Sequence, residues 1–156
     1  MIRLERILVP VDFSEFGDCA IRYGCEFARK FSSETHFLHV VEDAYPMVPE
    51  AGMLLPSQTD YIQELKASAE RGLTKIPDNK HCEGLSSIVR HVSVGAPFLE
   101  IIRYARQHQI DLIVIGTHGR TGLSHMLMGS VAERIVRKAH CPVLTIRPEG
   151  HSFVMP

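Results

Sequence analysis

The chain has 156 residues, of which 45% are hydrophobic and 22% are charged, and 17 Lys and Arg against 18 Asp and Glu give a formal net charge of −1. This length and composition are typical of one globular domain and exclude an intrinsically disordered chain. They also exclude a protein that binds nucleic acid mainly through charge, because no basic excess is left to neutralise a phosphate backbone.

The sequence predicts a cytoplasmic protein without a membrane span. No apolar run approaches the ~20 residues that a bilayer span needs, and residues 1–5 lack the apolar core of a signal peptide. The four cysteines have neither the C-x-x-C spacing of a redox or zinc site nor the density of a disulfide scaffold, which favours reduced thiols.

The first part of the chain predicts a strand, a helix and a second strand. Residues 7–11 are short, β-branched and apolar on both faces, as expected of a strand covered on both sides. Apolar residues then recur at three- and four-residue spacing, which predicts an amphipathic helix reaching about Lys30. These are Phe16, Ala20, Tyr23, Phe27, Ala28 and Phe31. The second strand is predicted from His36 to Val41.

Residues 42–60 interrupt this rhythm with three prolines and a glycine, which predicts a long connection. The connection also carries five large apolar residues, which either pack onto the domain or cover a ligand or partner. They are Met47, Val48, Met53, Leu54 and Leu55. Helical spacing returns from Ile62 to Ile76, and Pro77 ends that run.

The second half predicts a half-exposed strand at Ser87–Val94, a helix that begins near Pro97 and a buried strand at 112–115. A glycine-rich stretch, a helix from about Ser130 to His140 and a last strand at 143–147 follow. Residues 1–150 are expected to form one domain, and 151–156 a loose tail. Strands that alternate with helices predict an open five-stranded parallel sheet of order 3-2-1-4-5 with helices on both faces.

In such a sheet ligands bind beyond the carboxyl ends of the strands, where the winding direction reverses. The loops after Val11 and after Ile115 are therefore expected to face each other across a crevice. The second loop, residues 116–130, is rich in glycine, which permits close approach of backbone N–H groups to an anion. Ser130 and Glu133 have the spacing of a capping box, and a helix start of this kind favours a phosphate.

These residues leave two readings open. The glycine loop either binds a phosphate or is a tight strand–helix connection capped by Ser130, and it matches neither the Walker loop nor the dinucleotide fingerprint. Asp12 either accepts hydrogen bonds from a ribose or holds Mg²⁺, or it caps the following helix, a role that Ser14 could equally fill.

The spacing Gly116-x-x-Gly119, nine further residues and then Gly129-Ser130 resembles the ATP-binding signature of the universal stress protein (UspA) family. Val-Pro-Val-Asp-Phe-Ser at 9–14 is similar to that family's opening strand and loop, and Cys-Pro-Val-Leu at 141–144 is similar to its final strand. The resemblance covers residues 6–147 and leaves only the 42–60 connection without a family pattern. It implies an adenine nucleotide alpha hydrolase-like fold.

The resemblance also implies a nucleotide site and a dimer. Asp12 would lie at the ribose, the backbone of Val40 at the adenine, and the loop from Gly116 at the ribose and phosphates. The full set of implied binding residues is Pro10, Val11, Asp12, Val40, Ile115, Gly116, Thr117, His118, Gly119, Arg120, Thr121, Gly129, Ser130 and Val131. The ligand would be ATP, or ADP or AMP, with Mg²⁺, and a homodimer would pair its last strands, Val143 to Arg147, as an exposed edge strand allows.

Three functions from different classes follow. The leading one is an ATP-binding regulatory homodimer of the stress response, with an unidentified protein partner; the others are a slow ATPase or related adenine-nucleotide enzyme that uses Asp12, and a scaffold dimer without nucleotide. The loops contain no paired base and nucleophile, so no catalytic residue is predicted. No histidine pair has the i, i+4 spacing with a companion Glu of a zinc site, so no metal–histidine centre is predicted either.

Overall fold

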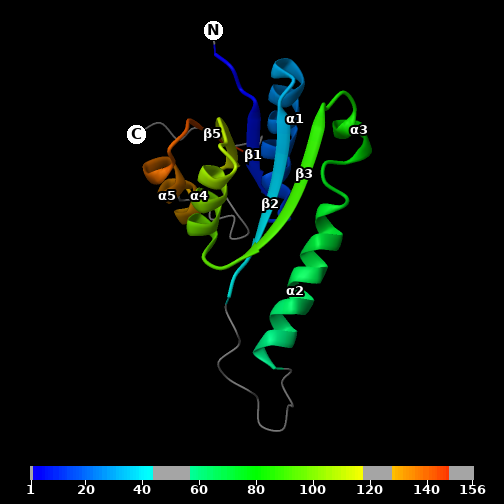
Figure 1. The fold of residues 1–156 in the computed structure, drawn as a ribbon, viewed down its shortest axis with the longest axis vertical. Coiled ribbons are helices and arrows are strands. Elements are labelled where there is room, and N and C mark those ends of the chain that lie inside the picture. The colour runs from blue at the N-terminus through cyan, green and yellow to red at the C-terminus, as the bar shows by residue number, and fades with distance from the viewer. Residues whose placement is uncertain (1, 44–56, 118–127, 148–156) are drawn as a thin grey trace, which may run out of the picture.

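The computed structural model describes residues 2–43, 57–117 and 128–147. Five parallel strands form one sheet in the order β3-β2-β1-β4-β5 (Figure 1), which confirms the predicted topology. The strands are β1 (Arg6–Pro10), β2 (Glu34–Val41), β3 (Ser87–Val94), β4 (Leu112–Gly116) and β5 (Val143–Ile146). The chain winds from β1 to β3 in one direction and resumes with β4 on the other side of β1, so its direction reverses between β1 and β4.

Helices cover both faces of this sheet (Figure 1). They are α1 (Glu15–Phe31), α2 (Gln58–Leu73), the short α3 (Asn79–Cys82), α4 (Pro97–Gln107) and α5 (Ser130–Lys138). Side chains of a strand alternate between faces. Ile7 and Val9 of β1 therefore pack in the core under α1 and α2, whereas Leu8 packs under α4 and α5. None of the helices in the described ranges is long and apolar enough to cross a membrane.

Helix α1 shows why its sequence begins and ends a helix where it does. The Ser14 hydroxyl caps its first turn by accepting a hydrogen bond from the Gly17 N–H at 3.2 Å. At the other end Ser32 adopts a left-handed conformation with φ of 56°, and its N–H reaches the carbonyls of the last turn. The loop between β1 and α1 follows directly on β1, so it lies at the carboxyl edge of the sheet.

Several boundaries differ from the sequence predictions. The second strand begins at Glu34 rather than His36, the last strand ends one residue early at Ile146, and residues 151–156 lie outside the described chain. Two positions of the predicted α1 stripe, Tyr23 and Phe31, are 46% and 36% exposed, because the stripe is wider than the surface that the sheet offers.

The connection between β2 and α2 is shorter than predicted. Helix α2 begins at Gln58 because Ser57 caps it, with its hydroxyl accepting from the Asp60 N–H at 3.2 Å. It ends at Leu73 rather than near Ile76, whose N–H instead donates to the Leu73 carbonyl in a turn. The apolar residues predicted to pack or cover a ligand, Met47, Val48, Met53, Leu54 and Leu55, lie outside the described residues.

Candidate functional site: a cavity where the sheet reverses direction

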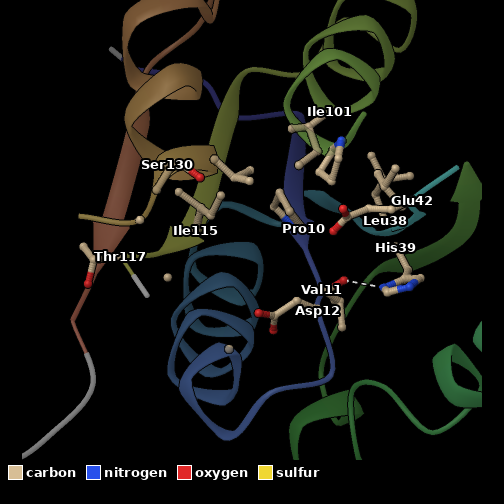
Figure 2. Close-up of a pocket in the computed structure, with 17 residues that line it drawn as sticks. Pro10, Val11, Asp12, Leu38, His39, Glu42, Ile101, Ile115, Thr117 and Ser130 are labelled. Carbon is tan, nitrogen blue, oxygen red and sulfur yellow. Dashed lines mark hydrogen bonds between the residues drawn. The ribbon is translucent and has the colours of Figure 1, made fainter. Parts of the chain in front are cut away.

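A cavity of about 270 Å³ opens at the carboxyl ends of β1, β2 and β4, at the point where the chain reverses direction (Figure 2). Ligands of open α/β sheets bind at such a position. Its described lining consists of Pro10, Val11, Asp12, Gly17, Leu38, His39, Val40, Glu42, Pro97, Ile101, Ile115, Gly116, Thr117, Gly129, Ser130, Val131 and Ala132.

The structure brings most of the predicted site residues together around this one cavity. Ten of the fourteen line it, from three strand ends and one helix start: Pro10, Val11, Asp12, Val40, Ile115, Gly116, Thr117, Gly129, Ser130 and Val131. The other four, His118, Gly119, Arg120 and Thr121, lie outside the described residues. The described ends of the β4 loop, at Gly116–Thr117 and Gly129–Ser130, therefore line the same cavity as Val11 and Asp12 of the β1 loop.

Asp12 lines the cavity and also braces the loop that enters α1. Its Oδ1 accepts hydrogen bonds from the Ser14 N–H at 3.0 Å and from the Ser14 hydroxyl at 2.7 Å. A Cβ on Gly17 would lie 3.0 Å from the same oxygen, so glycine gives this carboxylate room. Of the two cap residues considered from sequence, Ser14 caps α1 and Asp12 holds Ser14 in place.

The start of α5 supplies the cavity with backbone N–H groups. The first N–H groups of a helix have no intrahelical acceptor, and they lie at the positive end of the helix dipole. No side chain of the described chain caps α5, whose N-cap is Gly129 in an extended conformation. Gly129 is itself held by its N–H, which donates to the Thr117 carbonyl at 2.6 Å. This wall can therefore accept an anion.

The predicted capping box at Ser130 and Glu133 is wrong, although the helix does begin at Ser130. The N-cap is one residue earlier, at Gly129, and the Glu133 N–H donates to the Gly129 carbonyl at 3.0 Å. Ser130 is thus the first helical residue, a position from which its hydroxyl does not cap the helix.

The same absence of a cap recurs at α4, another helix whose first turn borders the cavity. Its N-cap is Ala96 and Pro97 follows, with no side-chain cap among the described residues. By contrast α1, α2 and α3 are capped by Ser14, Ser57 and Asp78. The two helix starts without a side-chain cap among the described residues thus both border the cavity, together with the capped start of α1 at Gly17.

The opposite wall is apolar and is fixed by a histidine that the sequence analysis missed. Leu38, Ile101 and Ile115 are 1%, 4% and 7% exposed and form a surface suited to a flat, apolar group. His39 ties the end of β2 to the end of β1, with its Nδ1 donating to the Val11 carbonyl at 2.7 Å (Figure 2).

Seven lining residues were not predicted from sequence: Gly17, Leu38, His39, Glu42, Pro97, Ile101 and Ala132. The alternation of β2 could have indicated Leu38, which lies on the same face as Val40 two residues away. Ile101 and Glu42 carried no such signal, because only the packing of α4 and the end of β2 brings them to this space.

The electrostatics of the described lining favour recognition by backbone groups. It contains two carboxylates, Asp12 and Glu42, and neither Lys nor Arg. An anion in this cavity would therefore depend on the N–H groups and dipole of α5, while a carboxylate such as Asp12 can accept hydrogen bonds from hydroxyls or share a cation with the anion.

Fold and cavity together define an α/β protein with a cavity at the switch point of a parallel sheet, bordered by the start of α5. Residues 3–147 match the family model of the universal stress protein family, and the chain belongs to that family. It is 33% identical over 144 residues to universal stress protein MJ0531 of Methanocaldococcus jannaschii, covering 92% of this chain and 82% of that protein.

Solved structures agree with this assignment. The universal stress protein UspA from Lactobacillus plantarum has a TM-score of 0.81 and 28% identity, over 94% of this chain and 100% of that chain. Two more distant neighbours share the fold, at 18% and 22% identity and TM-scores of 0.62 and 0.53. They are a universal stress protein in complex with cAMP and one from Archaeoglobus fulgidus in complex with dAMP.

Proposed function

We propose that the protein binds an adenine nucleotide in this cavity, with ATP and Mg²⁺ as the working ligand, and acts as a cytoplasmic regulatory homodimer of the stress response. The observation that carries the proposal is the uncapped start of α5 facing an apolar wall across a cavity at the switch point. Relatives of the same fold in complex with cAMP and dAMP support the choice of an adenine nucleotide.

The cavity suits the three parts of a nucleotide in different places. The apolar wall of Leu38 and Ile101, with the backbone of Val40, would receive the adenine. Asp12 would accept hydrogen bonds from the ribose, and the start of α5 from Gly129 would hold the phosphates. His118, Gly119, Arg120 and Thr121 complete the proposed phosphate loop. Mg²⁺ would neutralise phosphate charge in a lining whose described residues offer no Lys or Arg.

Replacing Asp12 by Asn is expected to weaken ATP binding about tenfold. A hydrogen bond to a charged group contributes about 1.5–3 kcal/mol, and 1.36 kcal/mol corresponds to a factor of ten. Asn is a better choice than Ala, because its oxygen can still accept from the Ser14 N–H and hydroxyl that Asp12 holds. Calorimetric titration of both proteins with ATP and with 2′-deoxy-ATP measures the effect.

The 2′-deoxy ligand identifies the contact. If Asp12 binds the ribose, the Asn substitution costs less with 2′-deoxy-ATP than with ATP, because the two changes remove the same interaction. Asp18→Asn is the matched control, since Asp18 lies exposed in the first turn of the same helix. Absence of ATP binding by the unaltered protein would overturn the proposal and favour a scaffold without nucleotide, and phosphate release abolished by Asp12→Asn would favour a hydrolase.

A dimer through β5 is expected to dissociate at least tenfold more readily when Thr145 is replaced by Pro. The carbonyls of Pro142 and Ile146 accept hydrogen bonds from the β4 side, at 3.0 and 2.8 Å. Backbone groups alternate in direction along a strand, so the Thr145 N–H points to the free edge of β5. Proline removes that donor and leaves the ladder to β4 intact.

Sedimentation velocity over a range of concentrations measures the dimer. Thr145→Val keeps the backbone N–H and a β-branched side chain, so this control is expected to sediment as the unaltered protein does. Identical sedimentation of the Pro variant would rule out pairing through β5.

A further inference from the structure

A cluster of titratable side chains lies on the α4 face of the sheet, away from the cavity. At its centre is His36 of β2, which is 3% exposed. Its Nε2 lies 2.9 Å from Glu34 Oε1, and its Nδ1 lies 2.9 Å from the hydroxyl of Tyr104 on α4. Neutral His36 satisfies both partners when Nε2–H donates to the carboxylate and Nδ1 accepts from the tyrosine hydroxyl.

Two further histidines surround Tyr104. The ring of His108 stacks on Tyr104 with centroids 4.0 Å apart, and the ring of His91 on β3 lies 5.3 Å from Tyr104. His108 is also 5.7 Å from His36. Three imidazoles from β2, β3 and α4 thus meet at one tyrosine. They do not make a metal centre: within residues 2–43, 57–117 and 128–147 no three His, Cys, Asp or Glu side chains are placed to hold an ion.

The charges around the cluster balance only while the histidines are neutral. Glu34 is the carboxylate in contact with His36, and Arg6 of β1 lies 3.9 Å from the same Oε1. The Ser87 hydroxyl of β3 donates to Glu34 Oε2 at 3.2 Å. From α2, the charges of Lys66 and Glu70 act on the pKa of His91 in opposite directions. Glu34 can therefore offset one proton, whereas a further proton on His91 adds a positive charge that no second carboxylate in contact with the cluster offsets among the described residues.

Protonation of His36 also changes its hydrogen bond to Tyr104. Burial, followed by the charge of Glu34, raises the pKa of Tyr104 to about 12, so its hydroxyl keeps the proton that it donates to Nδ1 of neutral His36. Protonated His36 carries a hydrogen on Nδ1, which the tyrosine oxygen can accept only if the hydroxyl turns its own proton away. Among the described residues the Tyr104 hydroxyl has no second acceptor to turn to.

The direction of the pKa shifts agrees with this geometry. Burial lowers the pKa of His36 below its usual range despite the opposing hydrogen bond and charge of Glu34, and the nearby His108 lowers it further. Burial and then His108 also lower the pKa of His91. An unfolded histidine titrates near pH 6.5, so the unfolded chain takes up these protons first. The contact is therefore fully stable above about pH 6.5 and weakens as the pH falls below it.

Two elements connect the cluster to the nucleotide cavity. Helix α4 begins at the cavity with Pro97 and Ile101 and carries Tyr104 and His108 further along. Seven residues of helix span about 10 Å, so the cavity and the cluster lie about 10 Å apart along the same helix. Strand β2 likewise carries His36 at the cluster and Leu38 at the cavity wall.

We propose that His36, His91, His108 and Tyr104 form an acid-sensitive contact that holds α4 on the sheet, and that protonation of His36 and His91 loosens α4 and weakens ligand binding in the cavity. Loosening of α4 stands on the cluster alone, and the effect on ligand binding rests on the proposed function. One proton is tolerable, because Glu34 and the Tyr104 ring can each attract an imidazolium. A second proton, on His91, adds repulsion that no further carboxylate in contact with the cluster offsets among the described residues.

Hydrogen exchange of the complete protein at pH 7.5 and pH 5.5, corrected for the intrinsic exchange rate, tests the contact. We expect the protection of α4 amides to fall about tenfold more than that of α1, because the opened segment takes up protons that the packed cluster excludes. In the double variant His91→Gln/His108→Gln, the additional loss of protection in α4 relative to α1 should be less than about threefold, because Gln is neutral at either pH. Both histidines are exposed, so the substitutions do not disturb the core. His140→Gln, an exposed histidine beyond α5, is the matched control and should keep the full additional loss.

Two results would overturn the proposal of an acid-sensitive contact. One is an equal loss of protection in α4 and α1 of the unaltered protein, and the other is an additional loss of protection in α4 that is as large in the double variant as in the unaltered protein. Calorimetry with ATP and Mg²⁺ at both pH values tests the effect on the cavity. If the double variant loses less affinity for ATP at pH 5.5 than the unaltered protein does, the effect of the cluster on the cavity is supported. An equal loss of affinity in the two proteins overturns that effect. Absence of ATP binding at pH 7.5 would instead overturn the proposed function, and hydrogen exchange would still decide whether the contact exists.

Discussion

Replacing Gly129 by Glu is expected to weaken ATP binding at least about 100-fold, or roughly 2.7 kcal/mol, while the protein stays folded. Gly129 is the N-cap of α5, and it lines the cavity beside the uncapped N–H groups. A carboxylate there would bind those N–H groups itself and repel a phosphate that approaches the same place. The residue has φ of −68°, which any amino acid adopts, so the substitution introduces no backbone strain.

Gly129→Ala is the control for this experiment. It adds a methyl group without charge at the same backbone conformation, and we expect its ATP affinity to stay within about threefold, or roughly 0.6 kcal/mol. Calorimetric titration with ATP and Mg²⁺ measures both variants, and thermal unfolding verifies that they are folded. Equal affinities of the Glu variant and the unaltered protein would place the phosphates away from α5.

The largest expected effect on stability comes from Gly24 in the middle of α1. Replacement of glycine by alanine within a helix ordinarily stabilises a protein by roughly 0.5–1 kcal/mol. Here an added Cβ would lie 2.4 Å from Cγ2 of Val9, a fully buried residue of the central strand β1. Overpacking of a core costs about 1–3 kcal/mol, so we expect the clash to prevail and Gly24→Ala to destabilise the protein by about 2 kcal/mol.

Urea unfolding of a double-mutant cycle checks the cause. Val9→Ala removes the clashing methyl group, so Gly24→Ala should cost at least about 1 kcal/mol less in that background. Gly72→Ala on α2 is the matched control, because its Cβ would meet the ring of Phe13 at 2.9 Å, and that ring is 42% exposed and can turn aside. Additive free energies of unfolding in the cycle would show that α1 and β1 do not pack as closely as described.

These predictions differ in how far the sequence alone could have led to them. Gly129 stands out in the sequence, because it precedes the last helix at a spacing that resembles a nucleotide-binding motif. Gly24 does not, since its significance depends on Val9, fifteen positions away on a strand that only packing brings beneath it.

The strand order and most of the candidate site were predictable because their signals are local. Runs such as residues 7–11 and 112–115 are apolar on both faces, which indicates central strands, and alternation with helices then leaves few topologies. The switch-point rule directs attention to the loops after β1 and β4, where Asp12 and Gly129 were predicted and where both line the cavity.

What only the tertiary structure decided involves residues far apart in the chain. Glu42 and Ile101 reach the cavity through the end of β2 and the docking of α4, and His36 meets Tyr104 across 68 positions. Each of these side chains has an ordinary local pattern, so periodicity places it on a face but does not name its partner. The same holds at the start of α5, where Ser130 has the spacing of a cap but Gly129 occupies the N-cap position. Local propensity determined which elements form in this protein, whereas the register and close packing between elements determined which side chains meet, because a contact depends on both of its sides.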